Sequence, residues 1–129
     1  MATEFKRVVF SSVPAGTITA SGQKIYATPA NCDTVVIGCL LTNTSGSSIT
    51  ADVLIATQDS TSGAVGSLGN ADVYLIKGAL VPVGSSLEVI SGKVVVANTT
   101  SNAGDGDAIH IRCSTATSMD ATISVLENT

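Results

Sequence analysis

The stretch Ile109-His110-Ile111-Arg112-Cys113 places apolar side chains at its odd positions and polar ones at its even positions. Because successive side chains of a β-strand point to opposite faces of the sheet, this alternation predicts a strand with one face packed inward and the other facing solvent or a partner. The segment Ala121-Thr122-Ile123-Ser124-Val125 repeats the pattern. No window shows the i, i+3, i+4, i+7 spacing of an amphipathic helix over three turns. The sequence therefore predicts an all-β protein.

Similar alternation and β-branched runs recur along the whole chain and predict about eight strands. They cover residues 7–13, 17–27, 34–42, 49–57, 72–80, 86–97, 107–114 and 120–127. All three prolines lie in turn-like tetrapeptides, namely Val13-Pro14-Ala15-Gly16, Thr28-Pro29-Ala30-Asn31 and Val81-Pro82-Val83-Gly84. Proline sets φ for the second position of a β-turn, and a following Gly or Asn tolerates the backbone conformation with which the turn ends. Each tetrapeptide is therefore expected to reverse the chain.

Eight strands in 129 residues fit a single-domain antiparallel β-sandwich of jelly-roll type, a fold that leaves few sheet edges exposed. We expect this domain to span residues 7–129. The polar stretch before it, residues 1–6, is predicted to be a flexible N-terminal arm. The segment 59–70 is a longer loop than the turns elsewhere, and the sequence assigns it no role.

Two runs lack alternation, Val35 to Leu41 and Val94 to Ala97. Continuous apolar runs are typical of strands covered on both faces. In an isolated two-sheet sandwich one face of each strand should be exposed to solvent, so these runs predict a second covering surface, such as another subunit.

The charge balance and composition exclude several classes of partner. Six basic against ten acidic residues give a net charge of −4, and no basic run is longer than Lys6-Arg7, so nucleic-acid binding is not expected. The apolar runs fall far short of the roughly 20 residues that a membrane helix needs. Residues 1–7 carry charges without an apolar segment behind them, so no secretory signal is expected.

The three cysteines, Cys32, Cys39 and Cys113, cannot all pair within one chain and lack the C-x-x-C spacing of zinc or redox sites. We expect all three to be reduced and mostly buried. Cys39 lies in an apolar run and Cys113 is in phase with Ile109 and Ile111, so both should pack as small hydrophobic residues.

Residues for catalysis are few. The single histidine, His110, is on the polar phase of its strand and is expected to be exposed, and no Gly-x-Ser-x-Gly or glycine-rich nucleotide motif is present. The pair Asp105 and Asp107 could belong to a calcium-binding loop, but the further ligands of such a loop are missing. The pattern favours the interpretation that an Asp carboxylate caps a turn. The prediction is therefore no enzyme, no catalytic residue, no metal and no cofactor.

Four motifs, taken in order, carry a resemblance. They are Val13-Pro14-Ala15-Gly16-Thr17, Leu41-Thr42-Asn43-Thr44-Ser45-Gly46, Val81-Pro82-Val83-Gly84-Ser85-Ser86-Leu87-Glu88 and Gly106-Asp107-Ala108-Ile109-His110-Ile111. Their order resembles small β-sandwich accessory proteins of tailed-bacteriophage virions, which include capsid decoration or cement proteins and neck or tail proteins.

The resemblance implies a non-enzymatic structural subunit of the virion, assembled in the host cytoplasm, which decorates or cements the capsid. It also implies a homo-oligomer, a trimer, that contacts other virion proteins such as the major capsid protein. A neck or tail location is the alternative within this class. Outside it, the alternative is a receptor- or carbohydrate-binding module, although the tryptophans common in such modules are absent.

Overall fold

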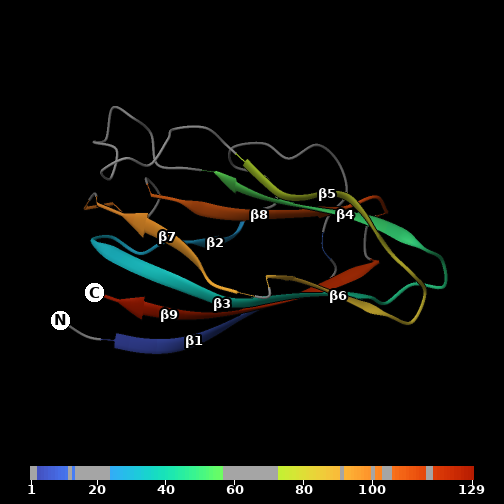
Figure 1. Ribbon diagram of the computed structural model, residues 1–129, viewed down its shortest axis with the longest axis horizontal. Coiled ribbons are helices and arrows are strands. Elements are labelled where there is room, and N and C mark those ends of the chain that lie inside the picture. The colour runs from blue at the N-terminus through green and yellow to red at the C-terminus, as the bar shows by residue number, and fades with distance from the viewer. Residues whose placement is uncertain are drawn as a thin grey trace.

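The structure is a computed structural model that describes residues 3–11, 13, 24–56, 73–90, 92–99, 101–102, 106–115 and 118–129. Within these residues the chain forms nine strands and no helix. The strands build two antiparallel sheets that pack face to face (Figure 1). The predicted all-β sandwich is thus confirmed.

The two sheets are called sheet A and sheet B here. Sheet A contains, in spatial order, β1 (Thr3–Phe10), β9 (Met119–Asn128) and β3 (Cys32–Asn43), with β6 (Ser86–Ile90) and β7 (Val94–Asn98) both pairing with β3. Sheet B contains β2 (Lys24–Ala27), β8 (Ala108–Cys113), β4 (Ile49–Ala56) and β5 (Val73–Val81), in that order. Early and late strands therefore alternate across each sheet, as in a jelly roll.

The segment 86–97, expected to be one strand, is two strands. β6 pairs with residues 39–42 of β3, and β7 pairs with residues 32–36 of the same strand. Gly92 and Lys93 interrupt the alternation between the two halves. β9 pairs with the opposite edge of β3, so β6 and β7 share one edge of β3. Sheet A is therefore four strand positions wide, and β6 and β7 together occupy the fourth position.

The first strand begins at Thr3 instead of Arg7, so the expected boundary between arm and domain at residue 6 is wrong. β1 pairs with β9 in continuous register from Thr3 opposite Asn128 to Phe10 opposite Ala121. Residues 3–6 thus belong to sheet A. Their partners lie more than 100 positions away, and the sequence therefore contained no local signal for this pairing.

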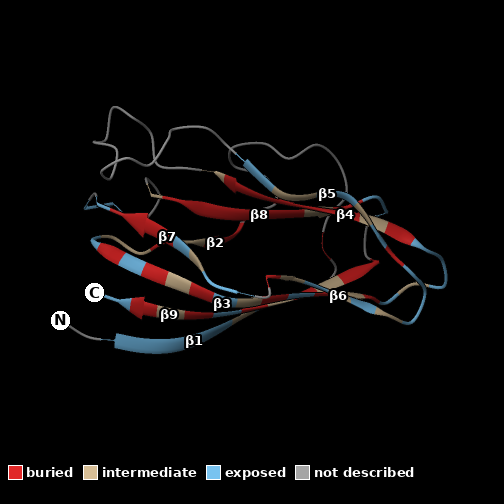
Figure 2. Ribbon diagram, viewed as in Figure 1, coloured by how far each residue is buried: buried red, intermediate tan, exposed pale blue. Residues whose placement is uncertain are grey.

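The core lies between the sheets, and the alternation located it correctly. Inward-facing side chains of both sheets are fully or almost fully buried, including Val36, Cys39, Leu41, Ile109, Ile111, Cys113, Ala121, Ile123 and Val125. Figure 2 shows β4 and β8 of sheet B mostly buried, whereas β1 and much of β5 are exposed. The expectation that His110 is exposed is wrong, because this residue is fully buried. β8 lies inside sheet B between β2 and β4, and His110 is paired with the buried Leu54.

Two of the three proline turns fall on described residues and have the expected geometry. Asn31 has a φ of 50° and Gly84 a φ of 70°, so each ends its tetrapeptide in the left-handed region. The amide of Ser85 donates to the carbonyl of Pro82 at 3.2 Å, which closes the second of these turns. The first tetrapeptide beyond Val13, and the loop 59–70, lie outside the described residues.

Candidate functional site

The residues considered for chemistry lie apart in the fold. His110 is buried in β8, and Asp107 stands just before that strand. The Asp107 carboxylate accepts the amide N–H of Ala97 at 3.0 Å, and its own amide donates to the Ala97 carbonyl at 2.9 Å. Asp107 therefore caps the entry to β8, as the turn interpretation predicts, while Asp105 lies outside the described residues. Among the residues that the structure describes, no three His, Cys, Asp or Glu side chains are grouped as metal ligands.

The three cysteines are free and buried, as predicted. Burial raises the pKa of the Cys39 thiol to about 12, so this thiol stays protonated at neutral pH. The Cys113 thiol donates to the carbonyl of Thr115 at 2.7 Å. These contacts give Cys39 and Cys113 structural surroundings, not the electropositive and accessible ones of reactive cysteines.

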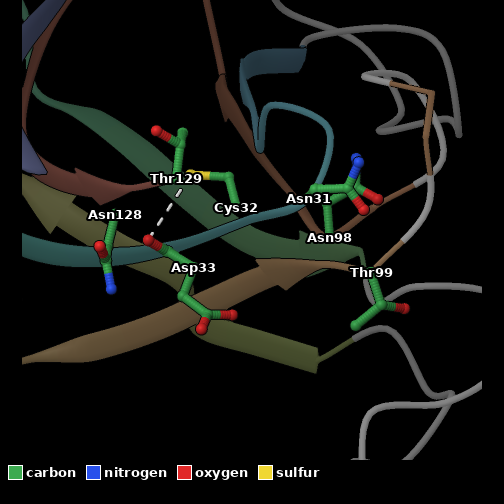
Figure 3. Close-up of a pocket in the computed structure, with 7 residues that line it drawn as sticks. All are labelled: Asn31, Cys32, Asp33, Asn98, Thr99, Asn128 and Thr129. Atoms are coloured by element: carbon green, nitrogen blue, oxygen red, sulfur yellow. Dashed lines mark hydrogen bonds between the residues drawn. The ribbon is translucent and has the colours of Figure 1, made fainter. Parts of the chain in front are cut away.

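A shallow polar pocket opens at the end of the sandwich where β3, β7 and β9 meet (Figure 3). It is lined by Asn31, Cys32, Asp33, Asn98, Thr99, Asn128 and Thr129. The Asn98 amide nitrogen already donates to the carbonyls of Thr28 at 3.1 Å and Asn102 at 2.8 Å. Sequence reasoning missed this pocket because its walls come from three distant segments. Its amide groups suit a neutral polar ligand better than they suit acid–base chemistry.

A buried polar cluster also escaped the sequence analysis. The Tyr26 hydroxyl donates to the Glu127 carboxylate at 2.7 Å and lies 2.9 Å from the Thr34 hydroxyl, and the Lys6 ammonium is 2.7 Å from the other Glu127 oxygen. Since Tyr26 is on β2 and the other three residues are on β9, β3 and β1, the cluster ties sheet B to sheet A. Buried polar groups that are all hydrogen-bonded hold a core in one arrangement. The cluster is therefore a structural clamp.

The pKa of Glu127 shows how the clamp is balanced. Burial raises the pKa of this carboxyl, but the hydrogen bonds from Lys6 and Tyr26 and the positive charge of Lys6 outweigh burial and leave the pKa below its usual value of 4.5. Desolvation of the Tyr26 phenol raises its pKa well above the usual value of 10.0. At neutral pH the cluster thus combines a carboxylate, an ammonium group and a neutral phenol.

This balance predicts how Glu127→Gln changes acid stability. A folded pKa below the unfolded one means that the carboxylate stabilises the fold above about pH 4.5 and that this contribution is lost as the pH falls through the folded pKa. The variant should therefore be less stable than the wild type near pH 7, and the difference should shrink below pH 4.5. Urea midpoints at pH 7, 5 and 3 measure this, with Asp33→Asn, which changes an exposed carboxylate on β3, as control. A difference that stays constant with pH would contradict the assignment.

The outer face of sheet A carries several exposed apolar side chains. Here the term means the side of β1, β9, β3, β6 and β7 that points away from sheet B. Cross-strand register aligns one apolar row across all four positions of the sheet, from Phe5 through Leu126 and Val35 to Val95. The other apolar side chains on this face are Val9, Ile37 and Leu40. Exposed fractions of 76% for Phe5 and 62% for Val95 show that nothing in the described chain covers the ends of the row.

The runs that predicted a second covering surface build the centre and one edge of this face. Val35 and Val95 are directly paired, and both point outward. Within the described chain these runs are buried on their inner side only, since Ile37, Leu40 and Val95 are exposed. A covering surface from outside the described chain therefore stays a prediction, and the outer face of sheet A is where it would bind.

The chain was compared with protein families, curated proteins and solved structures. No family model matches it, and neither a curated protein nor a solved structure gives a match. In the part of the chain that the structure describes, no helix has the length and apolar character to span a membrane.

Proposed function

We propose that this protein is a non-enzymatic accessory subunit of a tailed-phage virion that acts through its surfaces, as a decoration or cement protein of the capsid. The observation that carries the proposal is the apolar outer face of sheet A. A sheet face that stays in water ordinarily carries polar side chains. Beside polar side chains such as Arg7, Thr122 and Ser124, this face presents seven apolar residues, four of them in one row, which is typical of a surface that a protein partner covers.

The partners that we propose are further copies of the chain and other virion proteins, such as the major capsid protein. Affinity for a capsid lattice can arise from many weak, repeated contacts, because a symmetric oligomer gains effective concentration with each site that it engages. The buried carboxylates of Asp107 and Glu127 support such a role, since both are committed to contacts within the fold.

The polar pocket favours a second candidate, a receptor- or carbohydrate-binding module. Amide and carboxylate groups such as those of Asn31, Asp33 and Asn128 are suited to sugar hydroxyls. The pocket is shallow, however, and its seven lining residues include no aromatic ring on which a sugar could stack. We therefore rank this function second. Binding of the protein to sugars on a glycan array, and loss of that binding in Asn128→Ala, would favour the binding-module function.

The copy number in purified virions tests the main proposal. Quantitative mass spectrometry should find on the order of hundreds of copies per particle if the protein decorates the capsid lattice, because every lattice position repeats by symmetry. Particles that lack the protein should also lose their contents at a lower temperature, since a ligand of the assembled shell stabilises it by mass action.

Other copy numbers would revise or overturn the proposal. About a dozen copies or fewer would place the protein at the neck or tail, where symmetric rings are small. Complete absence from purified virions would overturn the virion role and leave the binding module as the better explanation.

A further inference from the structure

We propose that two copies of this chain pack sheet A against sheet A about a twofold axis that runs parallel to the strands. The inference rests on the proposed function in that this face is the one assigned to assembly. It goes further by naming the occupant, a second copy, and the residues that meet.

The strand order of sheet A makes the outer face compatible with a twofold contact. The sheet is four positions wide, with β1 at one edge and β6 with β7 at the other. An axis between β9 and β3 exchanges these two central strands and also exchanges the two edges. A rotation about this axis does not change the height of a residue along the strand direction. Each cross-strand row of one copy therefore lies over the same row of the other copy.

The apolar row is complementary to itself under this operation. Phe5 at one edge comes to lie opposite the partner's Val95, and Leu126 opposite the partner's Val35. The row therefore meets only apolar side chains along its whole length. Phe5 and Val95 are the two most exposed members, and the contact covers both of them at once.

Two charges on the outer face of sheet A support the same axis. Arg7 is paired with Ser124 on the β1 side, and Glu88 is paired with Leu40 on the β6 side. Leu40 pairs with Thr122, and Thr122 pairs with Val9, so Glu88 lies at the same height along the sheet as Val9. Glu88 is therefore displaced from Arg7 by two residues along the strand direction, or about 7 Å. Exchange of the edges brings Arg7 of each copy to the same edge as the partner's Glu88, displaced from it by these two residues along the strand, a distance that an arginine side chain can span.

Neither charge has an ion-pair partner within the described part of its own chain. The twofold contact would thus form two equivalent Arg7–Glu88 pairs between the copies. Charge complementarity of this kind selects one docking orientation among several of similar apolar area.

The other arrangements fit less well. A twofold axis across the strands at the level of Arg7 would place Phe5 over the partner's Val9, but it would place Leu126 over the partner's polar Thr122 and the Arg7 side chains of the two copies against each other. Like charges that face each other in an interface disfavour it. A ring of three copies, the state that the resemblance implies, needs two different patches for each contact, whereas this face matches itself.

A charge exchange tests the inference in solution. The wild-type protein should have the mass of a dimer by light scattering at micromolar concentration. Arg7→Glu and Glu88→Arg should each weaken dimerisation about tenfold or more, because each places like charges together, and the double variant should recover wild-type affinity. Lys77→Glu, on the exposed surface of β5 in sheet B, is the matched control and should dimerise normally.

A cross-link reports the axis directly. Phe5→Cys/Val95→Cys should give a covalent dimer with a short bis-maleimide, since the native cysteines are buried. Phe5→Cys/Val9→Cys, which would pair under the crosswise axis, should react much less. Circular dichroism confirms that each variant keeps its β signature.

A monomer at every concentration tested, a trimer, or a double variant that fails to recover dimerisation would each overturn the inference. These failures are separate from failure of the proposed function, which copy number in virions decides. If the protein forms the dimer but is absent from virions, the twofold contact is supported and the virion role is not. If it is present in virions but the double variant does not recover dimerisation, the virion role is supported and the twofold contact is not.

Discussion

Asp52→Ala is expected to lower the free energy of unfolding by about 3–5 kcal/mol, because it removes one partner of a buried ion pair. Asp52 is 4% exposed on β4. One carboxylate oxygen is 2.5 Å from the Arg112 guanidinium, and the other accepts the amide N–H of Gly78 at 2.6 Å. The variant would remove the carboxylate that pairs with the partly buried Arg112 guanidinium and accepts the Gly78 amide N–H. Urea unfolding at pH 7 measures the change.

Two further variants make this result specific. Asp52→Asn should lose less stability, because its amide oxygen can still accept the Gly78 N–H while the charge attraction to Arg112 is lost. Asp33→Ala removes an exposed carboxylate from β3 and should change the free energy of unfolding by no more than about 0.5 kcal/mol. Equal effects of Asp52→Ala and Asp33→Ala would refute the buried-pair assignment.

Gly106→Ala is expected to destabilise the fold by about 3 kcal/mol, at the upper end of the usual cost of overpacking. A Cβ at this position would overlap the Asn98 side chain and lie 2.9 Å from the Asn98 Cα. Asn98 cannot move aside easily, because its amide nitrogen donates to the carbonyls of Thr28 and Asn102. The loss should therefore reflect a steric conflict with the backbone of β7. Thermal and urea unfolding report its size.

Gly46→Ala is the matched control for this substitution. A Cβ at Gly46 meets nothing within 4 Å. Both variants change backbone entropy in the unfolded chain by the same amount, so the difference between them isolates the steric cost. If the two variants unfold alike, the close approach of Gly106 to Asn98 does not limit stability.

Alternation along single segments was enough to predict most of the fold. Ile109, Ile111 and Cys113 are buried where their phase predicts, and so are Ile123 and Val125. Strand position and inward face are local properties, because the period of two is built into the extended backbone. Turn residues are local in the same way, as the left-handed φ of Asn31 and Gly84 shows.

The candidate surface was only partly predictable. The runs from Val35 and from Val94 indicated excess apolar area, but not that Val35 and Val95 are paired in one row with Phe5 and Leu126. Register between strands depends on which strands are neighbours, and that choice is made by packing of the whole domain. The same limit explains why β1 was expected to begin four residues too late.

By itself, then, the sequence determined the all-β class, the positions of most strands, two of the proline turns and the buried cysteines, since each follows from the chemistry of neighbouring residues. Tertiary structure alone decided the jelly-roll neighbours. It buried His110 by placing β8 inside sheet B, and it joined Asp52 to Arg112 and Tyr26 to Glu127. Those partners are 60 and 101 positions apart. The first contact forms only when β4 and β8 pair within sheet B, and the second only when the two sheets pack on each other, so no local pattern can encode either of them.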